Sequence, residues 1–317
     1  MRLKKDDTPG FWRACMKLES LKMNIRFKGG DGFPRNVVFD RMRKLYMVGD
    51  NLLQDAYQSD LILQSPMLES LDWVIDEVSG IKDRFTHRLW PQPKKVHIRG
   101  SCIKDEELAF ILNGARSGLE GIEDLELGDC ELGTQTLKAL NIHFSTLVRL
   151  DIYSAKFSVR SIPSDLLCLC PRLEVLKAND VFAKNVAERG PWICQQLRKL
   201  RICFRFQVSE QDLHQLVYER LSTLIRLECL IIEYPIADRS DCIDGLVIRL
   251  DCGLGHLASL QQLTDFNIVR TYNNRFRQPE REDLVWMVEK WRKLRRIAGH
   301  FNTDNVSVFE SHGIAVQ

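Results

Sequence analysis

One short apolar pattern recurs along the chain and constrains its fold more than any other feature of the sequence. It places apolar side chains at its first, fourth and sixth positions, and the clearest copy is Ile122-Glu123-Asp124-Leu125-Glu126-Leu127. Three further copies are degenerate, because one begins with Pro93, one carries Phe266 and one reaches Gly299 at its sixth position. Eleven copies start at residues 18, 42, 68, 93, 122, 147, 173, 197, 227, 263 and 294.

The directions in which these apolar side chains point predict the fold. Its alternating end is typical of a short strand that turns three apolar side chains into a shared core. The segment between copies must return to start the next parallel strand, and a helix does so with few unsatisfied backbone groups. The steps of 24 to 36 residues lie within or a little above the leucine-rich-repeat period of roughly 20–29 residues. We therefore predict an α/β leucine-rich-repeat solenoid, an arc or horseshoe with parallel strands on its concave face and helices and loops on its convex face.

Domain organisation follows from the repeat. Residues 1–317 are predicted to form a single domain of about eleven units, in which 302–317 add a C-terminal cap of a helix, a glycine stop and an edge strand. Few residues precede the first unit, so we expect a preceding segment or a partner to cover the first sheet edge.

The connectors carry further local signals. Helical spacing predicts helices at 105–112, at 209–221 beginning with the cap-like Ser209, and at 282–291. The glycine-rich stretch 27–41 favours a loop, and 246–250 favours an inserted strand or loop ahead of a helix at 254–260.

Composition excludes several classes of function. With 45 basic and 43 acidic side chains and a net charge of +2, the chain has no global attraction for nucleic acid or for an anionic membrane. It contains no apolar stretch of the roughly 20 residues that a membrane span needs, and no secretory signal. We expect a cytoplasmic or nuclear protein whose ten cysteines are mostly reduced and buried.

No motif points to catalysis. One close pair, Cys168-x-Cys170, with Cys194 and Cys203 downstream does not match the two close pairs usual for zinc. The seven histidines stand in no catalytic motif, and Gly253-x-Gly255 follows no nucleotide-binding strand. We predict that the chain is not an enzyme and holds no metal and no cofactor.

Candidate binding residues lie at the variable positions of the strands, which point into the concavity. The residues predicted to contact a protein partner are Arg198, Lys199, Arg201, Lys94, Lys95, His97, Glu123, Asp124, Glu126, Tyr46 and Tyr153. Their charges form acidic and basic blocks on neighbouring strands, so cross-strand neutralisation is an alternative reading. In the eighth repeat Arg198, Lys199, Arg201 and Arg205 outnumber the expected partners Glu174 and Glu228, which favours a site for an acidic peptide or phosphate.

Four stretches carry a family resemblance. They are the Cys170-Pro171 step with Leu173 and Leu176, the segment from Gly190 to Leu200, and the segments 250–257 and 285–294. They resemble fungal F-box proteins with ribonuclease-inhibitor-like, cysteine-containing leucine-rich repeats. The resemblance implies substrate recognition in a ubiquitin ligase, with a Skp-type adaptor and cullin as partners, although the sequence has no room for an F-box before the repeats. The alternative is a structural or vestigial repeat protein with no ligand of its own.

Overall fold

The computed structural model describes residues 8–24, 37–48, 55–75, 93–114, 121–207, 210, 212–235, 245–269, 278–299 and 301–317. The chain forms two compact units, Met1–Val159 and Arg160–Gln317. In both units the described residues repeat one scheme, a short strand followed by a connector that leads to the next strand.

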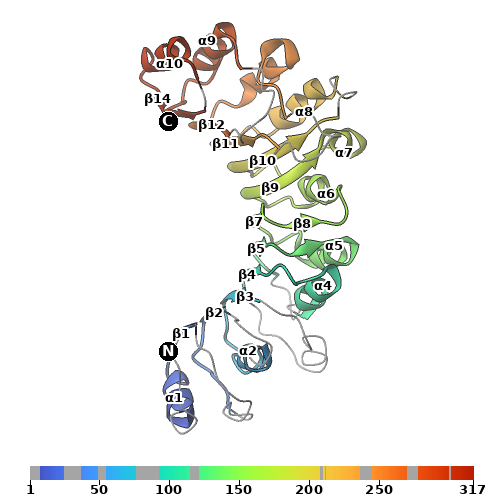
Figure 1. The fold of residues 1–317 in the computed structure, drawn as a ribbon, viewed down its shortest axis with the longest axis vertical. Helices are drawn as coiled ribbons and strands as arrows, with labels where there is room; N and C mark the ends of the chain where they lie inside the picture. The colour runs from blue at the N-terminus through green and yellow to red at the C-terminus, as the bar shows by residue number, and fades with distance from the viewer. Residues whose placement is uncertain are drawn as a thin grey trace. The chain divides into compact units, whose positions relative to one another are not determined.

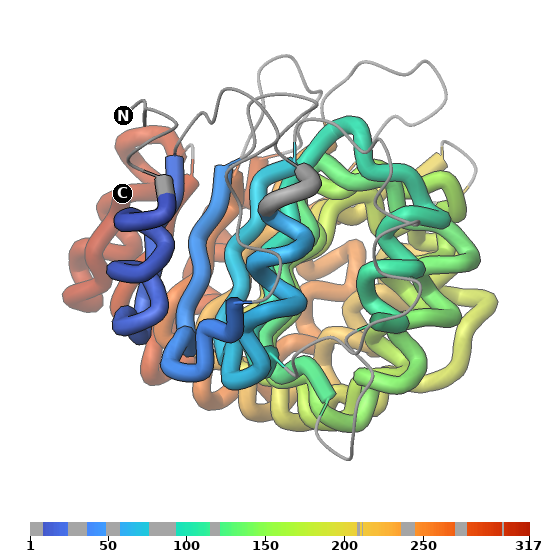
Figure 2. The backbone as a smooth tube through the Cα atoms, turned by 90° about the horizontal axis from the view of Figure 1, so that it is seen from below, coloured from blue at the N-terminus to red at the C-terminus, as the bar shows by residue number. Residues whose placement is uncertain are grey.

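The described residues of the first unit contribute six parallel strands to the main sheet, in the order of the chain. They are β1 (Ser20–Met23), β2 (Lys44–Val48), β3 (Ser70–Val74), β4 (Lys95–Arg99), β5 (Asp124–Gly128) and β7 (Arg149–Ile152). Figure 2 shows the early strands, in blue, running side by side. The helical connectors are α1 (Thr8–Cys15), α2 (Asp55–Leu63), α4 (Asp105–Gly114), α5 (Thr134–Leu140) and η2 (Asn141–His143). Helices α4 and α5 lie together on one side of the strands (Figure 1).

A second, two-stranded parallel sheet joins two connectors of this unit. It pairs β6 (Glu131–Leu132) with β8 (Lys156–Phe157). Asp105 of α4 also links neighbouring connectors, because its carboxylate accepts hydrogen bonds from the backbone N–H groups of Gly133 and Thr136, both at 2.8 Å. These donors belong to the first turn of α5, so the side chain of one repeat caps the helix of the next.

The second unit follows the same scheme with six parallel strands. They are β9 (Val175–Phe182), β10 (Lys199–Arg205), β11 (Cys229–Glu233), β12 (Asp265–Val269), β13 (Arg296–Ala298) and β14 (Ala315–Val316). The connectors include α6 (Ile162–Leu169), α7 (Ala183–Glu188), α8 (Leu213–Ser222), α9 (Arg281–Lys290) and α10 (Thr303–Glu310). Two 3₁₀ helices, η4 (Leu250–Cys252) and η5 (Leu254–Ser259), precede β12.

The apolar repeat sets the position of every strand that it predicted. In all eleven copies the strand begins two residues after the first position of the pattern, as β5 at Asp124 follows Ile122. The apolar positions form the core between strands and connectors, where Leu125 and Leu127 are fully buried. A parallel strand in each repeat, with helical connectors behind it, is the leucine-rich-repeat architecture. The C-terminal segment adds the predicted helix α10, a turn at Gly313 with φ of 71°, and the edge strand β14.

The connectors depart from expectation in detail. Helices α4 and α9 match their predictions, and α9 opens with a capping box between Glu280 and Asp283. Of the strand or loop expected at 246–250, the structure has a loop that leads into η4, and the helix expected at 254–260 is the 3₁₀ helix η5. Helix α8 begins at Leu213, whereas the predicted cap Ser209 and most of the expected loop at 27–41 lie outside the described residues.

The cysteines of the described residues behave as predicted for reduced thiols. All nine are free, and five of them are buried. Burial raises the pKa of both Cys170 and Cys194 to about 12, which keeps these thiols protonated. Within the described part of the chain, no helix has the length and apolar character needed to cross a membrane.

Candidate functional site on the exposed face of the strands

One face of the strands points away from the core. We define the sheet face as the side chains at the third, fifth and seventh positions of each repeat, which are exposed or half-buried in most strands. The fifth positions of neighbouring strands pair directly. In the first unit this column reads Lys22, Tyr46, Asp72, His97, Glu126 and Asp151. In the second unit it reads Lys177, Arg201, Ile231, Asn267 and Ala298.

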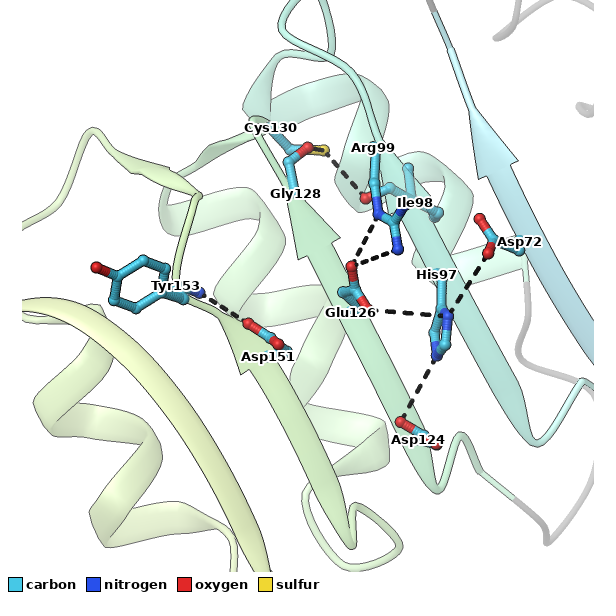
Figure 3. A network of polar contacts seen from close by, with 10 residues as sticks. All are labelled: Asp72, His97, Ile98, Arg99, Asp124, Glu126, Gly128, Cys130, Asp151 and Tyr153. Carbon is cyan, nitrogen blue, oxygen red and sulfur yellow. Dashed lines mark hydrogen bonds and ion pairs between the residues drawn. The ribbon is translucent and has the colours of Figure 1, made fainter. Parts of the chain in front are cut away.

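His97 of β4 lies at the centre of a cluster of carboxylates on β3 and β5. Its Nδ1 atom is 3.9 Å from Asp72 Oδ2 and 3.9 Å from Glu126 Oε2, and its Nε2 atom is 3.7 Å from Asp124 Oδ1. Figure 3 shows the imidazole between Asp72 on one side and the two acidic side chains of β5 on the other. The parallel register produces this arrangement, because Asp72, His97 and Glu126 occupy the same position of three successive repeats.

Two arginines neutralise part of the cluster. Arg99 donates from Nε to Glu126 Oε1 at 2.8 Å, and its Nη2 atom also lies 2.8 Å from that oxygen. The hydrogen bond to Glu126 raises the pKa of the Arg99 guanidinium. Arg149 Nε is 3.6 Å from Asp124 Oδ2. The described residues contain no group of three or more His, Cys, Asp or Glu side chains arranged to hold a metal ion.

The second position of the repeats has a different role. Its residues alternate in charge over the first five repeats, as Glu19, Arg43, Glu69, Lys94 and Glu123, and again over three successive repeats of the second unit, as Glu174, Arg198 and Glu228. Arg43 forms an ion pair with Glu69, Lys94 Nζ is 3.6 Å from Glu123 Oε1, and Arg198 Nε is 3.4 Å from Glu228 Oε1. We call this column the charge ladder. Three of the predicted binding residues, Lys94, Glu123 and Arg198, belong to it.

The basic side chains of the eighth repeat have carboxylate partners other than the expected Glu174 and Glu228. Arg201 pairs with Glu233, whose side chain is only 4% exposed, and Arg205 pairs with Asp180. The expectation that these arginines outnumber their partners was therefore wrong. Glu233 lies at the seventh position of the next repeat, and Asp180 has a positive φ of 55° in a strand whose register with β10 shifts. Lys199 remains exposed, in register with Cys229.

The two predicted tyrosines are placed differently relative to the His97 cluster. Tyr46 is next to Asp72 on the neighbouring strand, and the ammonium of Lys22 lies 4.6 Å from the centre of its ring. Tyr153 follows β7 in a turn, where its backbone N–H donates to Asp151 Oδ1 at 3.2 Å. Its ring points away from His97 in Figure 3. The structure thus brings His97, Asp124 and Glu126 together, with Lys95 exposed beside Asp124, and leaves Tyr153 outside this group.

Two members of the cluster were absent from the predicted binding residues. Asp72 shares the fifth-position column with His97 and Glu126, so the column itself was the signal that could have found it. Arg99 is at the seventh position, where its role depends on the rotamer that reaches Glu126. The sequence pattern does not specify such a rotamer.

Comparisons with known proteins assign no family. No protein-family model and no curated protein matches the sequence. Among solved structures the chain is similar to one described as "Crystal structure of TLR13-ssRNA13 complex", with 13% sequence identity and a TM-score of 0.46. The alignment covers 90% of this chain and 43% of that one, so the chain spans less than half the length of that protein.

Proposed function

We propose that the chain is a protein-interaction module that binds its partner through the sheet face. The observation that carries this proposal is the His97 cluster, in which an imidazole and three carboxylates from three neighbouring strands are half-buried and close together. Side chains that are fixed before a partner arrives lose little conformational freedom on binding, which favours affinity. Half-buried charges also select partners, because an unmatched partner must desolvate them without compensation.

A structural role without a ligand is the second candidate, and the charge ladder favours it. Lys94, Glu123 and Arg198 already have ion-pair partners on neighbouring repeats. Exposed pairs of this kind contribute under about 1 kcal/mol each. Ion pairing between neighbouring repeats therefore accounts for the alternation of charge, and no binding partner is needed to explain it.

The narrower form of the proposal is substrate recognition in an F-box-like ubiquitin ligase of the cytoplasm or nucleus. It is supported by the resemblance of the Cys170-Pro171 step and of the segments 190–200, 250–257 and 285–294 to fungal F-box repeat proteins. A Skp-type adaptor and a cullin are the partners that this form requires.

The test is an affinity pulldown with the full chain and three variants. Asp72→Asn/Glu126→Gln alters the cluster of the first unit with little change in shape, and Arg198→Glu/Lys199→Glu reverses the exposed charges of the second. Arg201 is left intact because its loss would leave Glu233 buried without this guanidinium. Lys138→Glu, an exposed lysine on helix α5, is the matched control.

The proposal expects a partner that is captured by the wild type and the control and is lost from at least one sheet-face variant, while circular dichroism shows all four proteins folded. Adaptor and cullin in the wild-type eluate would support the ligase form. A partner captured equally by all four proteins would exclude the sheet face as its site. Eluates that match bare resin would favour the structural role.

A further inference from the structure

The residues at the amino ends of the strands in the second unit form a line of positive charge. They occupy the second position of each repeat and the two positions just before the repeat, and we call them the strand rim. Among these described positions, in the repeats of β9 to β13, the carboxylates are Glu174 and Glu228. The cations are Arg172, Arg198, Arg226, Arg292, Lys293 and Arg295, and all of them are exposed.

Backbone hydrogen bonds hold the second positions of these repeats side by side. Arg198 donates its N–H to Glu174 O at 2.8 Å, and Glu228 donates to Arg198 O at 2.8 Å. Thr264 and Arg295 continue the series, with donor–acceptor distances of 2.8 Å and 2.9 Å. Since neighbouring strands lie about 4.8 Å apart, the strand rim is a continuous edge roughly 20 Å long.

The contacts of the cations within the strand rim leave most of their charge in place. Arg226 donates to Gln196 Oε1, and Lys293 Nζ donates to Gln262 Oε1 at 2.6 Å. An amide oxygen accepts these hydrogen bonds but carries no net charge. Among the described residues, Arg198 is the one rim cation with an ion pair, to a carboxylate of the next repeat at 3.4 Å.

The same positions of the first unit carry no such excess. Their described residues hold as many carboxylates as cations, namely Glu19, Asp40, Glu69 and Glu123 beside Lys17, Arg41, Arg43 and Lys94. Pairing of neighbouring repeats therefore accounts for the first unit but not for the second. The flanking positions of the second unit do not supply the missing carboxylates. Its third positions add Lys199 and Arg296 against Asp265, and the charged residue four positions before the repeats is Lys290.

Three features of the strand rim indicate the class of its partner. All its cations except Lys293 are arginines, whose planar guanidinium matches the geometry of a carboxylate. Ile225 also belongs to the strand rim and is 56% exposed, so it offers an apolar contact that suits a protein segment. The strand rim contains no aromatic residue among its described positions. Sites for single-stranded nucleic acid usually combine positive charge with aromatic side chains on which bases stack.

We propose that the strand rim of the second unit binds an extended acidic segment of a protein partner. Carboxylates of that segment pair with Arg172, Arg292 and Arg295, and an apolar side chain of the segment packs on Ile225. An extended chain covers about 3.3–3.6 Å per residue, so roughly six residues span the strand rim. The strand rim includes no position of the sheet face, so either proposal can fail without the other.

The experiment is a fluorescence anisotropy titration of the full chain against a labelled peptide of about eight residues, composed of glutamates and a few leucines. The control probes are the same peptide with glutamine in place of glutamate, and an oligouridylate of equal length. We expect saturable binding of the acidic peptide that is at least about tenfold tighter than binding of either control. Its affinity should fall when sodium chloride is raised from about 50 mM to about 300 mM, because salt screens exposed charges.

A variant of the strand rim and a matched control test the site from the protein side. Arg226→Glu/Arg295→Glu reverses two exposed rim charges, and Arg198 is left intact because it already has an ion pair. Lys138→Glu/Lys156→Glu makes the same change in net charge at exposed positions of the first unit. The rim variant should bind the acidic peptide about tenfold more weakly, and the control should bind it within about twofold of the wild type. Circular dichroism checks that both variants are folded.

Several outcomes would overturn the proposal. No saturable binding, equal affinity for the glutamate and glutamine peptides, or affinity that is insensitive to salt would exclude recognition by charge. An equal loss of affinity in the rim variant and in the control would mean that net charge alone attracts the peptide. Tighter binding of the oligouridylate would assign the strand rim to nucleic acid. Loss of the peptide in Asp72→Asn/Glu126→Gln but not in the rim variant would place it on the sheet face and leave the proposed function standing.

Discussion

Individual side chains in this protein are constrained by their own repeat and by the neighbouring one, and His214 illustrates the consequence. Its ring stacks on Phe206 with centroids 3.9 Å apart, and its Nδ1 accepts a hydrogen bond from the backbone N–H of Val247 at 3.4 Å. Burial lowers the pKa of His214 from 6.5 to about 4. The folded chain therefore holds this imidazole neutral, and protonation would remove the acceptor that Val247 uses.

We predict that the free energy of unfolding decreases as pH falls from about 6.5 to about 4. The unfolded chain binds the proton at the higher pH, so the contribution of His214 is complete above pH 6.5 and is lost on acidification through the folded pKa. The loss amounts to about 3.5 kcal/mol at most, at about 1.4 kcal/mol for each unit of pKa. Urea unfolding at pH 7 and pH 4.5 measures it. His214→Gln should show a shallower pH dependence than the wild type, and identical slopes would contradict the assignment.

At the scale of the element, close packing constrains the residue type at the end of a strand as well as inside it. Gly100 follows β4, where Ile75 donates its N–H to Arg99 O at 2.7 Å and Gly100 donates to Gly128 O at 3.0 Å. A Cβ atom at Gly100 would lie 2.2 Å from the carbonyl oxygen of Ile75, which is backbone and cannot swing away. The close approach of these chains therefore needs a residue without a side chain.

Gly100→Ala is expected to destabilise the protein by about 1–3 kcal/mol, the usual cost of overpacking a rigid site. Gly190→Ala is the matched control, because a Cβ atom there meets nothing within 4 Å. Thermal unfolding of the two variants checks the difference. If Gly100→Ala were as stable as the Gly190→Ala control, the backbones at Gly100 and Ile75 could move apart without a loss in the free energy of unfolding.

The sequence predicts the strands better than the contacts between their side chains. Spacing locates all eleven repeat strands because the apolar positions must reach one core, and the fifth-position column follows from the same register. Spacing does not predict β6 and β8, which are two residues long. It also misses the pairing of Arg205 with Asp180, since this depends on a register shift inside β9. Regular periodicity cannot encode a local irregularity.

At the scale of the whole molecule, the repeats make stability a local property. Each strand pairs with the strands of adjacent repeats, as β5 does with β4 and β7. In such proteins, stability is close to a sum over repeats and the interfaces between neighbours. A defect in one repeat should therefore weaken its neighbours first.

Leu125→Ala tests this locality, because Leu125 is fully buried in β5. We expect a loss of about 2–5 kcal/mol, as for other large-to-small core changes. Native-state hydrogen exchange should become faster in β4, β5 and β7 and stay unchanged in β11, β12 and β13. Equal acceleration in all six strands would indicate that the chain opens as one cooperative unit.

The charge ladder has a consequence for how such a chain can lengthen or shorten over evolutionary time. Neighbouring repeats carry opposite charges at the second position, as Arg43 and Glu69 do. Insertion or loss of a single repeat would bring two like charges side by side, whereas gain or loss of two repeats would preserve the alternation. Within the charged runs, the alternation therefore has a period of two repeats, twice the length of the structural unit.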